Sequence, residues 1–557
     1  MVSLSTTTTA PGVRQQRKAA RLAAAAPSLT ARSGKIVDPE RITALLQSVL
    51  LPGDRVALEG DNQKQADFLS RSLARVDPGA VHGLHLLVPS LSRPEHLDLF
   101  ELGIASRVDF AFAGAQSARV AALLDEGVLT IGAIHTYLEL YARLFVDLVP
   151  DVALVAAVQA DPDGNLYTGP NTEDTPALIE AAAFRGGLVI VQVDEVVERG
   201  ALPRVDIPGD WVDLVVRADR PCFIEPLFTR DPRKITDVHV LLAMLAIRGV
   251  YERHEVTSLN HGIGFDTAAI ELLLPTYGER LGLKGRVARN FVLNPHPTLI
   301  PAIESGWVES VTCFGGEVGM EAYCAARPDV FAVGPDGSLR SNRMTAQNAG
   351  LYATDMFIGS TLQIDAVGNS STVTEGRLSG FGGAPNLGSD PRGRRHPTPA
   401  WLGLHTAEAG SGVLRGRKLV VQIAETYGAG ARPRYTERLD AVAVGEKAGM
   451  PLAPVMIYGD DVTHVISEDG IAYLYLARDL EERRQAVAAL AGAGPLGTTS
   501  TPAQRERLRR DGVLALPEDL GVRRTDARRS MLAARSIEDL VTWSGGLYDP
   551  PSRFRSW

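Results

Sequence analysis

Short and almost uninterrupted apolar runs alternate with stretches of helical character along this chain, and this alternation limits the possible folds more than any other feature. In the first half such runs stand at residues 55–60 (RVALEG), 84–88 (LHLLV), 109–114 (DFAFAG), 152–158 (VALVAAV) and 187–193 (GLVIVQV). A strand that is covered by helices on both faces has no solvent-exposed side, so it reads as a continuous apolar run. The pattern predicts a parallel sheet between two layers of helices.

A second series of the same kind begins near Val256. Its clearest runs are residues 289–294 (RNFVLN), 308–315 (VESVTCFG) and 418–426 (KLVVQIAET). The chain has 557 residues, enough for several domains that each bury a core. We therefore predict an α/β protein with two tandem α/β/α domains. The predicted division is an N-terminal tail with a short helix at 1–35, the first domain at 36–255, the second domain at 256–500 and a C-terminal helical extension at 501–557.

The first 35 residues are basic and contain no acidic residue before Asp38. An Arg-rich, Ser/Thr-rich and acid-poor start is typical of an organelle transit peptide. The plainer interpretation is a tail that runs into a short Ala-rich helix near Arg14 to Ala26, and we favour it.

Charge and cysteine content exclude several classes of partner. The formal net charge is −9, with no basic face suggested for nucleic-acid phosphates. No apolar run reaches the roughly 18 residues that a membrane-spanning helix needs. The three cysteines, Cys222, Cys313 and Cys324, have no paired spacing, which fits a reducing cytosol and favours neither disulfides nor a metal site. We expect a cytoplasmic protein that binds no nucleic acid and no membrane.

A glycine-rich stretch, Ser379 to Asn386 (SGFGGAPN), is the most informative local motif. Adjacent glycines such as Gly382 and Gly383 let a backbone approach a ligand closely, and their N–H groups can stabilise an oxyanion during acyl transfer. A tight turn between two elements would explain the glycines equally well. The stretch is neither a dinucleotide-binding fingerprint nor a Walker loop.

Glu317 follows the apolar run at 308–315 and is surrounded by glycines. A carboxylate at the end of a strand in an α/β sheet can reach a substrate in the adjacent crevice, and carboxylates can act as nucleophiles. The alternative is a solvated loop glutamate or a helix cap. Glu321 fits that alternative better, because it lies one helical turn further on.

The stretch Asn260 to Thr267 contains two further candidates, Gly262 and Gly264, and leads into an apolar helical segment. With Asp266 or Thr267 as N-cap, the preceding loop would face the positive end of the helix and could bind an anion. Ordinary capping explains the same residues equally well.

Three other segments add weaker signals. The stretch Asn294-Pro295-His296-Pro297 ends a predicted strand, and both prolines stiffen the loop. Asn294 and His296 are candidates here: His296 could contact substrate, although a lone histidine is more often structural. Residues 59–65 and 169–175 are polar loops beside buried strands, where sites are common.

The following long segments together resemble the malonate decarboxylase alpha-subunit family: 59–69 (EGDNQKQADFL), 134–140, 164–177, 202–213, 224–232, 259–279 (LNHGIGFDTAAIELLLPTYGE), 293–304, 368–374 and 380–386. The resemblance covers nearly the whole chain. It also includes the basic tail at 14–26, which weighs against a transit peptide.

This resemblance implies two CoA-transferase-like domains, related to CoA transferases and the citrate lyase alpha subunit. It also implies that the chain transfers a thioester from acetate to malonate. The thioester would be carried on a phosphoribosyl-dephospho-CoA arm, which is a CoA-like ligand, and this arm would belong to an acyl carrier protein (delta) subunit. Partner beta and gamma subunits would then decarboxylate the malonyl thioester. This chain itself would bind no cofactor covalently.

By the same resemblance, Glu317 corresponds to the glutamate of an ExG motif that attacks the thioester, and the 380–383 loop supplies oxyanion amides. The match departs in two places: Gly316 and Val318 flank the glutamate where many relatives have Ser and Asn, and Asn386 stands where relatives have an aspartate after the loop. The citrate lyase relatives work by direct attack of the substrate carboxylate. A glutamyl intermediate and direct attack therefore both stay open.

Malonate carries a second carboxylate, for which Arg230 and the 262–264 loop are candidate partners, and we include Asn386 among the substrate-binding residues. Residues 465–472 (VISEDGIA) resemble a C-terminal motif of acyl-CoA transferases, and we expect them to support the region of the thioester arm. Two other functions fit the sequence less well: a transferase that uses free CoA, and an inactive scaffold.

Overall fold

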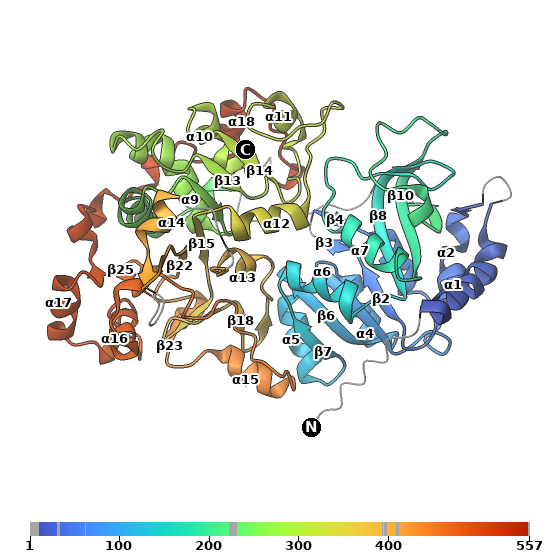
Figure 1. The fold of residues 1–557 in the computed structure, drawn as a ribbon, viewed down its shortest axis with the longest axis horizontal. Helices are drawn as coiled ribbons and strands as arrows, with labels where there is room; N and C mark the ends of the chain where they lie inside the picture. The colour runs from blue at the N-terminus through green and yellow to red at the C-terminus, as the bar shows by residue number, and fades with distance from the viewer. Residues whose placement is uncertain are drawn as a thin grey trace.

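The computed structural model describes residues 11–30, 34–61, 63–221, 231–392, 394, 398–407 and 412–554. The chain forms two α/β halves side by side, coloured blue to green and green to red in Figure 1. In the described part of the chain, no helix is long and apolar enough to cross a membrane.

The first half is built on a sheet that contains all five apolar runs predicted there. Its order is β1 (Ile36–Val37), β11 (Leu214–Arg217), β10 (Leu188–Val196), β8 (Val152–Ala160), β2 (Arg55–Leu58), β5 (Leu84–Ser90), β6 (Ala105–Phe112) and β7 (Thr130–Ile134). These neighbours pair in parallel, and only the short β9 (Leu166–Tyr167) pairs antiparallel, with β8. The predicted parallel sheet is confirmed for this half.

Helices cover both faces of this sheet. Val56 and Leu58 of β2 pack in one apolar core with α2 (Ile42–Val49), α3 (Asp67–Leu73), α4 (Pro94–Glu101) and α5 (Ser117–Asp125). Ala57, between them, packs in a second core with α6 (Tyr137–Val146) and α7 (Thr175–Ala183). Alternate side chains of one strand are thus buried on opposite faces, which explains its continuous apolar run.

The N-terminal helix α1 (Pro11–Ala25) packs on α2 of this half. Two of its arginines are buried in ion pairs with the first half: Arg14 with Asp151 at 2.9 Å and Arg21 with Asp54 at 2.7 Å. These two arginines are therefore part of the folded domain.

The second half is built on another sheet, ordered β14 (Ser310–Thr312), β13 (Asn290–Val292), β12 (Ser258–His261), β15 (Met356–Ser360), β22 (Leu419–Ile423), β24 (His464–Ser467), β25 (Gly470–Tyr473) and β26 (Leu514–Ala515). The strands are parallel as far as β24, and the last two are antiparallel. The runs predicted at 289–294, 308–315 and 418–426 are confirmed as strands.

The C-terminal part is folded onto the second half. Helices α8 (Asp237–Ala246), α9 (Phe265–Leu273) and α10 (Ile300–Glu304) share one core with Tyr548 and Phe554, while α16 (Leu480–Ala489) and α17 (Pro502–Arg510) pack in the core on the other face. Strand β26 lies inside the segment that we assigned to an extension, so that segment also contributes to the sheet. The domain boundaries themselves stay a prediction.

The two halves meet where the loops after their strands face one another. Helix α12 (Arg343–Tyr352) of the second half contacts α6 of the first. Gly380 forms an isolated antiparallel bridge with Phe112 at the end of β6. These contacts bring the glycine loop of one half onto the sheet of the other.

Candidate functional site

Glu317 lies at the boundary between the two halves. It follows β14 and is only 2 % exposed, so it is not a solvated loop glutamate. The side-chain amide of Gln63, from the hairpin of β3 (Gly60–Asp61) and β4 (Lys64–Gln65) in the first half, donates to Glu317 Oε2 at 3.2 Å. Glu321 is the first residue of α11 (Glu321–Ala326) and is exposed, as expected of a helix residue.

The two glycines before Glu317 are required by close contact between the halves. A Cβ atom on Gly315 would lie 1.5 Å from Glu173 Oε1, and one on Gly316 would lie 2.0 Å from Asn171 Oδ1. Asn171 also donates from Nδ2 to the backbone oxygen of Gln63 at 3.1 Å. The polar loop at 169–175 and the hairpin at 59–65 therefore meet the Glu317 segment.

The glycine loop is a turn whose amides are partly occupied. Gly380 and Gly382 have φ values of +72° and +59°, a region that favours glycine. The N–H groups of Phe381 and Gly382 both donate to Ala111 O, at 2.7 and 2.9 Å. The Gly382 amide thus holds the turn in place, whereas the Gly383 amide has no backbone acceptor among the described residues.

Asn386 joins the same cluster through α12. Its Nδ2 donates to Gln347 Oε1 at 3.1 Å. A Cβ on Gly383 would lie 2.3 Å from Gln347 Nε2, so Gln347 packs directly on the loop. Asn386 and Gly383 therefore share one neighbour on the helix that faces the first half.

Arg343, on the first turn of α12, connects the two predicted polar loops with the rest of the site. Its Nη2 lies 3.0 Å from Asp61 Oδ1 and its Nε lies 3.0 Å from Asp174 Oδ1, and it also pairs with Glu173. Its guanidinium carbon lies 4.4 Å from the centre of the Tyr137 ring. Tyr137 in turn donates its backbone N–H to Gly382 O at 3.1 Å. The Glu317 segment and the glycine loop thus belong to one connected network.

The carboxyl groups of this network titrate unusually. Burial raises the pKa of Glu173 to about 8 and that of Asp174 to about 6, against the opposing effect of Arg343. Burial likewise raises the pKa of Glu59 to about 7; Thr175 Oγ1 donates to this carboxyl at 2.5 Å. Strongly perturbed carboxyls are common at functional sites, and here they surround the boundary between the halves.

The remaining predicted residues lie at the carboxyl ends of β12 and β13. Asn260 donates to Val292 O. His296 Nδ1 lies 2.8 Å from the buried Glu271, which also contacts His261, so the histidine is engaged in a structural network of α9. Asn294 is buried, and its Oδ1 has no hydrogen-bond partner among the described residues.

Helix α9 begins earlier than predicted. It starts at Phe265 with Gly264 as N-cap, so the expectation that Asp266 or Thr267 caps it was wrong. Gly262 packs on β15, where a Cβ would lie 3.0 Å from Gly359 Cα, and a Cβ on Gly264 would lie 2.5 Å from Ser360 Oγ. Glycines are thus needed here for close packing. Arg230 lies outside the described residues.

The hairpin β24–β25 carries the motif at 465–472. Between its strands, Glu468 accepts hydrogen bonds from the backbone and hydroxyl of Thr426, which follows β22. The motif thus supports the end of a central strand. Its relation to a thioester arm stays a prediction.

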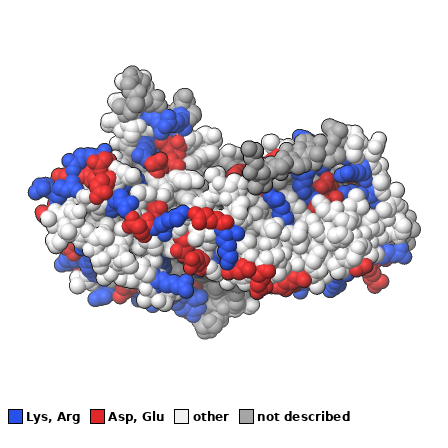
Figure 2. Space-filling view, turned by 90° about the horizontal axis from the view of Figure 1, so that it is seen from below, with Lys and Arg blue, Asp and Glu red and all other residues white. Residues whose placement is uncertain are grey.

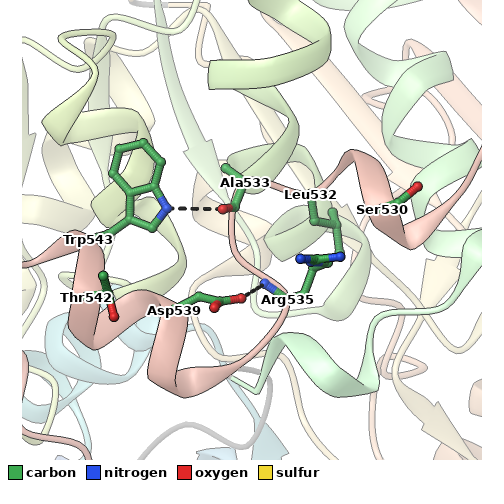
Figure 3. Close-up of a pocket in the computed structure, with 7 residues that line it drawn as sticks. All are labelled: Ser530, Leu532, Ala533, Arg535, Asp539, Thr542 and Trp543. Carbon is green, nitrogen blue, oxygen red and sulfur yellow. Dashed lines mark hydrogen bonds between the residues drawn. The ribbon is translucent and has the colours of Figure 1, made fainter.

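A shallow surface pocket of about 270 Å³ lies in the C-terminal segment (Figure 3) and contains none of the predicted site residues. Trp543 Nε1 donates to Ala533 O at 3.0 Å, and Arg535 N donates to Asp539 Oδ2 at 2.7 Å. These bonds lie within the segment that lines the pocket. On the face seen in Figure 2, Lys and Arg are interspersed with Asp and Glu, unlike the continuous basic face of a nucleic-acid-binding protein.

Comparison with solved structures defines the class of fold. The chain has the fold of CoA transferases. The alpha subunit of citrate lyase from Streptococcus mutans superposes with a TM-score of 0.57 at 15% sequence identity, covering 94% of this chain and 88% of that chain. An acyl-CoA transferase from Escherichia coli O157:H7 superposes with a TM-score of 0.51 at 13% identity, covering 80% of this chain and 89% of that chain. The predicted CoA-transferase-like α/β fold is confirmed.

Sequence comparison then gives the family. Residues 12–557 match the family described as "Malonate decarboxylase, alpha subunit, transporter". The chain is 54% identical over 528 residues to an acetyl-S-ACP:malonate ACP transferase of Malonomonas rubra, covering 94% of this chain and 95% of the relative. This chain belongs to the malonate decarboxylase alpha-subunit family.

Solved structures agree with this assignment. A chain of a Pseudomonas malonate decarboxylase hetero-tetramer in complex with malonate is 65% identical, with a TM-score of 0.94 and coverage of 98% of this chain and 99% of that chain. The alpha subunit of a malonate decarboxylase from Acinetobacter baumannii is 60% identical, with a TM-score of 0.93 and coverage of 97% and 99%.

Proposed function

We propose that this chain is the transferase that replaces acetyl by malonyl on the thioester of an acyl carrier protein. The observation that carries the proposal is the buried Glu317, which faces Gln63 of the other half in the same network as the glycine loop. The name of the Malonomonas rubra relative describes this activity. Glu317, Gly382 and Gly383 are the proposed catalytic group, with Gly382 holding the turn and Gly383 donating to the oxyanion.

Two balanced routes lead to the same products. In one, the Glu317 carboxylate attacks the acetyl thioester carbonyl, the C–S bond breaks, and the carrier thiolate then attacks the glutamyl carbonyl and releases acetate. Malonate next attacks the glutamyl thioester, and the thiolate returns to the malonyl carbonyl. In the other, malonate attacks the acetyl thioester directly and the C–S bond breaks, which leaves a mixed anhydride and the carrier thiolate. The thiolate then attacks the malonyl carbonyl of the anhydride and acetate leaves. Each route converts one thioester and one carboxylate into another such pair, so no electrons are transferred.

The substrate-binding part of the proposal involves Asn386 and Asn294, together with the loop at 262–264. Asn386 lies beside Gly383 through Gln347, and Asn294 offers a buried oxygen without a hydrogen-bond partner among the described residues. Asn260 and His296 are assigned to the support of these strand ends, because both are engaged in internal hydrogen bonds. Arg230 stays the candidate partner for the second carboxylate of malonate.

The proposal also includes the partners. The arm is taken to be phosphoribosyl-dephospho-CoA on a carrier subunit, and beta and gamma subunits are taken to decarboxylate the malonyl group in the cytoplasm. The Pseudomonas relative was crystallised as a hetero-tetramer with malonate, which supports work in a complex of several subunits.

The decisive experiment is intact-mass spectrometry of acetylated carrier protein incubated with this chain and malonate. We expect the acetyl-carrier peak to be replaced by malonyl-carrier, with release of one acetate for each carrier. Acetyl-CoA in place of the carrier tests the use of free CoA. Absence of malonyl-carrier with the wild-type chain, or equally fast exchange on free CoA, contradicts the proposal.

A further inference from the structure

Glu173 has a backbone conformation that a glutamate rarely adopts. Its φ is +45°, in the left-handed region that favours glycine, and its side chain is almost fully buried. A strained residue persists only where its surroundings hold it, and such residues cluster at functional sites. The chain therefore keeps a carboxyl at a position where glycine would relieve the strain.

One carboxyl oxygen of Glu173 is held by the other half of the molecule. Arg343 Nε donates to Glu173 Oε2 at 3.1 Å, and Nη2 donates to the same oxygen. The loop around Glu173 is fixed as well, because Thr172 N donates to Ser341 Oγ at 3.1 Å and Ser341 Oγ donates to Pro170 O at 2.9 Å. The position of the Glu173 carboxyl is thus fixed both by its bonds to Arg343 and by the bonds that hold its backbone loop.

The other oxygen, Oε1, is directed at the segment that carries Glu317. A Cβ on Gly315 would lie 1.5 Å from it, so this oxygen occupies the space beside the Gly315 backbone. It is buried and has no hydrogen-bond partner among the described residues. The start of α12 is attached to the same segment, since Asn342 N donates to Cys313 O at 3.3 Å.

We propose that Glu173 is a positioning residue for acyl exchange: held by Arg343, its carboxyl supports the backbone of Gly315 and so keeps Glu317 against Gln63. The effect on exchange rests on the proposed function, whereas the support of the segment does not. The role depends on the shape of the side chain and on its acceptor oxygen. An amide in its place can still accept from Arg343 and fill the same space.

The primary test compares Glu173→Gly with Glu173→Gln. Glycine suits the backbone conformation but removes the support. We therefore expect kcat for exchange to fall by about 30-fold or more, because small misplacements of reacting groups lower rates by such factors. The KM for malonate should change by less than about twofold, because this side chain does not bind malonate. Glu173→Gln should keep kcat within about threefold of wild type at neutral pH, since it retains the shape.

Glu255→Gly is the matched control. Glu255 is also a glutamate with positive φ, +50°, but it is exposed and pairs with Arg286 at 3.0 Å. Its replacement should leave kcat unchanged. A general effect of placing glycine in a strained turn would appear in this variant too.

Hydrogen exchange measures the support without relying on catalysis. We expect the amides of residues 315–320 to exchange at least about tenfold faster in Glu173→Gly than in wild type, Glu173→Gln or Glu255→Gly. Unchanged exchange there in a folded Glu173→Gly overturns the proposal. A Glu173→Gln variant as defective as Glu173→Gly also overturns it, because charge would then matter instead of shape. If wild type itself lacks acyl exchange, the proposed function fails, and hydrogen exchange still decides the role of Glu173.

Discussion

Glu317 and Glu321 have similar glycine-rich and apolar surroundings in the sequence, yet the structure separates them. Glu317 is buried against Gln63 of the other half, whereas Glu321 is exposed at the start of α11. We predict that Glu317→Ala lowers the exchange rate by about 100-fold or more, which is about 2.7 kcal/mol of transition-state stabilisation. Glu321→Ala should change it less than about threefold. Stopped assays of malonyl-carrier formation measure both.

A near-wild-type rate for Glu317→Ala would remove this side chain from both proposed routes. Intact-mass spectrometry of the chain separates the routes, because only the glutamyl route forms a covalent adduct between the chain and the carrier thiol. Adduct formation should be lost in Glu317→Gln.

The raised pKa of Glu173 predicts how stability depends on pH. Burial raises it from 4.5 to about 8, so between these values the folded chain holds a proton that the unfolded chain has released. Stability then falls with rising pH in this window, by at most about 1.4 kcal/mol per pH unit for one group. Glutamine has no such proton, so Glu173→Gln should gain stability relative to wild type up to about pH 8 and then level off. Urea unfolding at several pH values measures this, and a pH-independent difference contradicts it.

At the scale of elements, the glycine loop at 380–383 illustrates two separate uses of glycine. Gly382 has φ +59°, so Gly382→Ala should cost about 1–2 kcal/mol of stability from left-handed strain. Gly383 is not in that region, but its added Cβ would press on Gln347. We expect Gly383→Ala to unfold at nearly the same temperature as wild type, while the rate of acyl exchange falls about tenfold because the amide proposed to bind the oxyanion is displaced. Thermal unfolding and the exchange assay distinguish the effects of the two variants. A wild-type rate of acyl exchange in folded Gly383→Ala would mean that the loop is only a structural turn.

The long buried strands could be predicted from the sequence because their apolar runs are continuous. Short strands such as β1 and β26 have two residues each and carry no such signal. The start of α9 was misplaced because Asp266 and Thr267 are strong capping types, whereas close packing on Ser360 selects Gly264 as the cap. Element boundaries follow tertiary contacts that the local sequence does not contain.

Prediction of the site failed in the same way at Arg343. Its segment, NRMTAQNAG, resembles an ordinary polar helix start, and nothing local indicates that the arginine is buried against three carboxyls of the other half. The polar loops at 59–65 and 169–175 were recognised as candidates, and their convergence on Glu317 required the fold. Glu317 itself was proposed from its place after an apolar run, and its role in the site stays a prediction.

At the scale of the whole molecule, the candidate site lies between two halves of similar build. The second half contributes Glu317 and the glycine loop, and the first contributes Gln63 and the Ala111 carbonyl that holds the loop. Neither half alone contains the complete set. A site at such a boundary can exclude water when the halves are closed, as thioester chemistry requires.

This arrangement predicts a division of labour between subunits. Loss of carbon dioxide from a malonyl thioester leaves an enolate, which needs its own oxyanion donors. In the glycine loop the Gly382 amide is already bonded to Ala111, and Gly383 is assigned to acyl transfer. We therefore expect the purified chain to convert acetyl-carrier and labelled malonate into malonyl-carrier and acetate, and then to stop. Labelled carbon dioxide should appear in a gas trap only after partner subunits are added, and it should fail to appear when Glu317→Ala replaces the wild-type chain. Sustained gas release by the chain alone, with mass spectrometry excluding contaminating subunits, would show that this chain also decarboxylates.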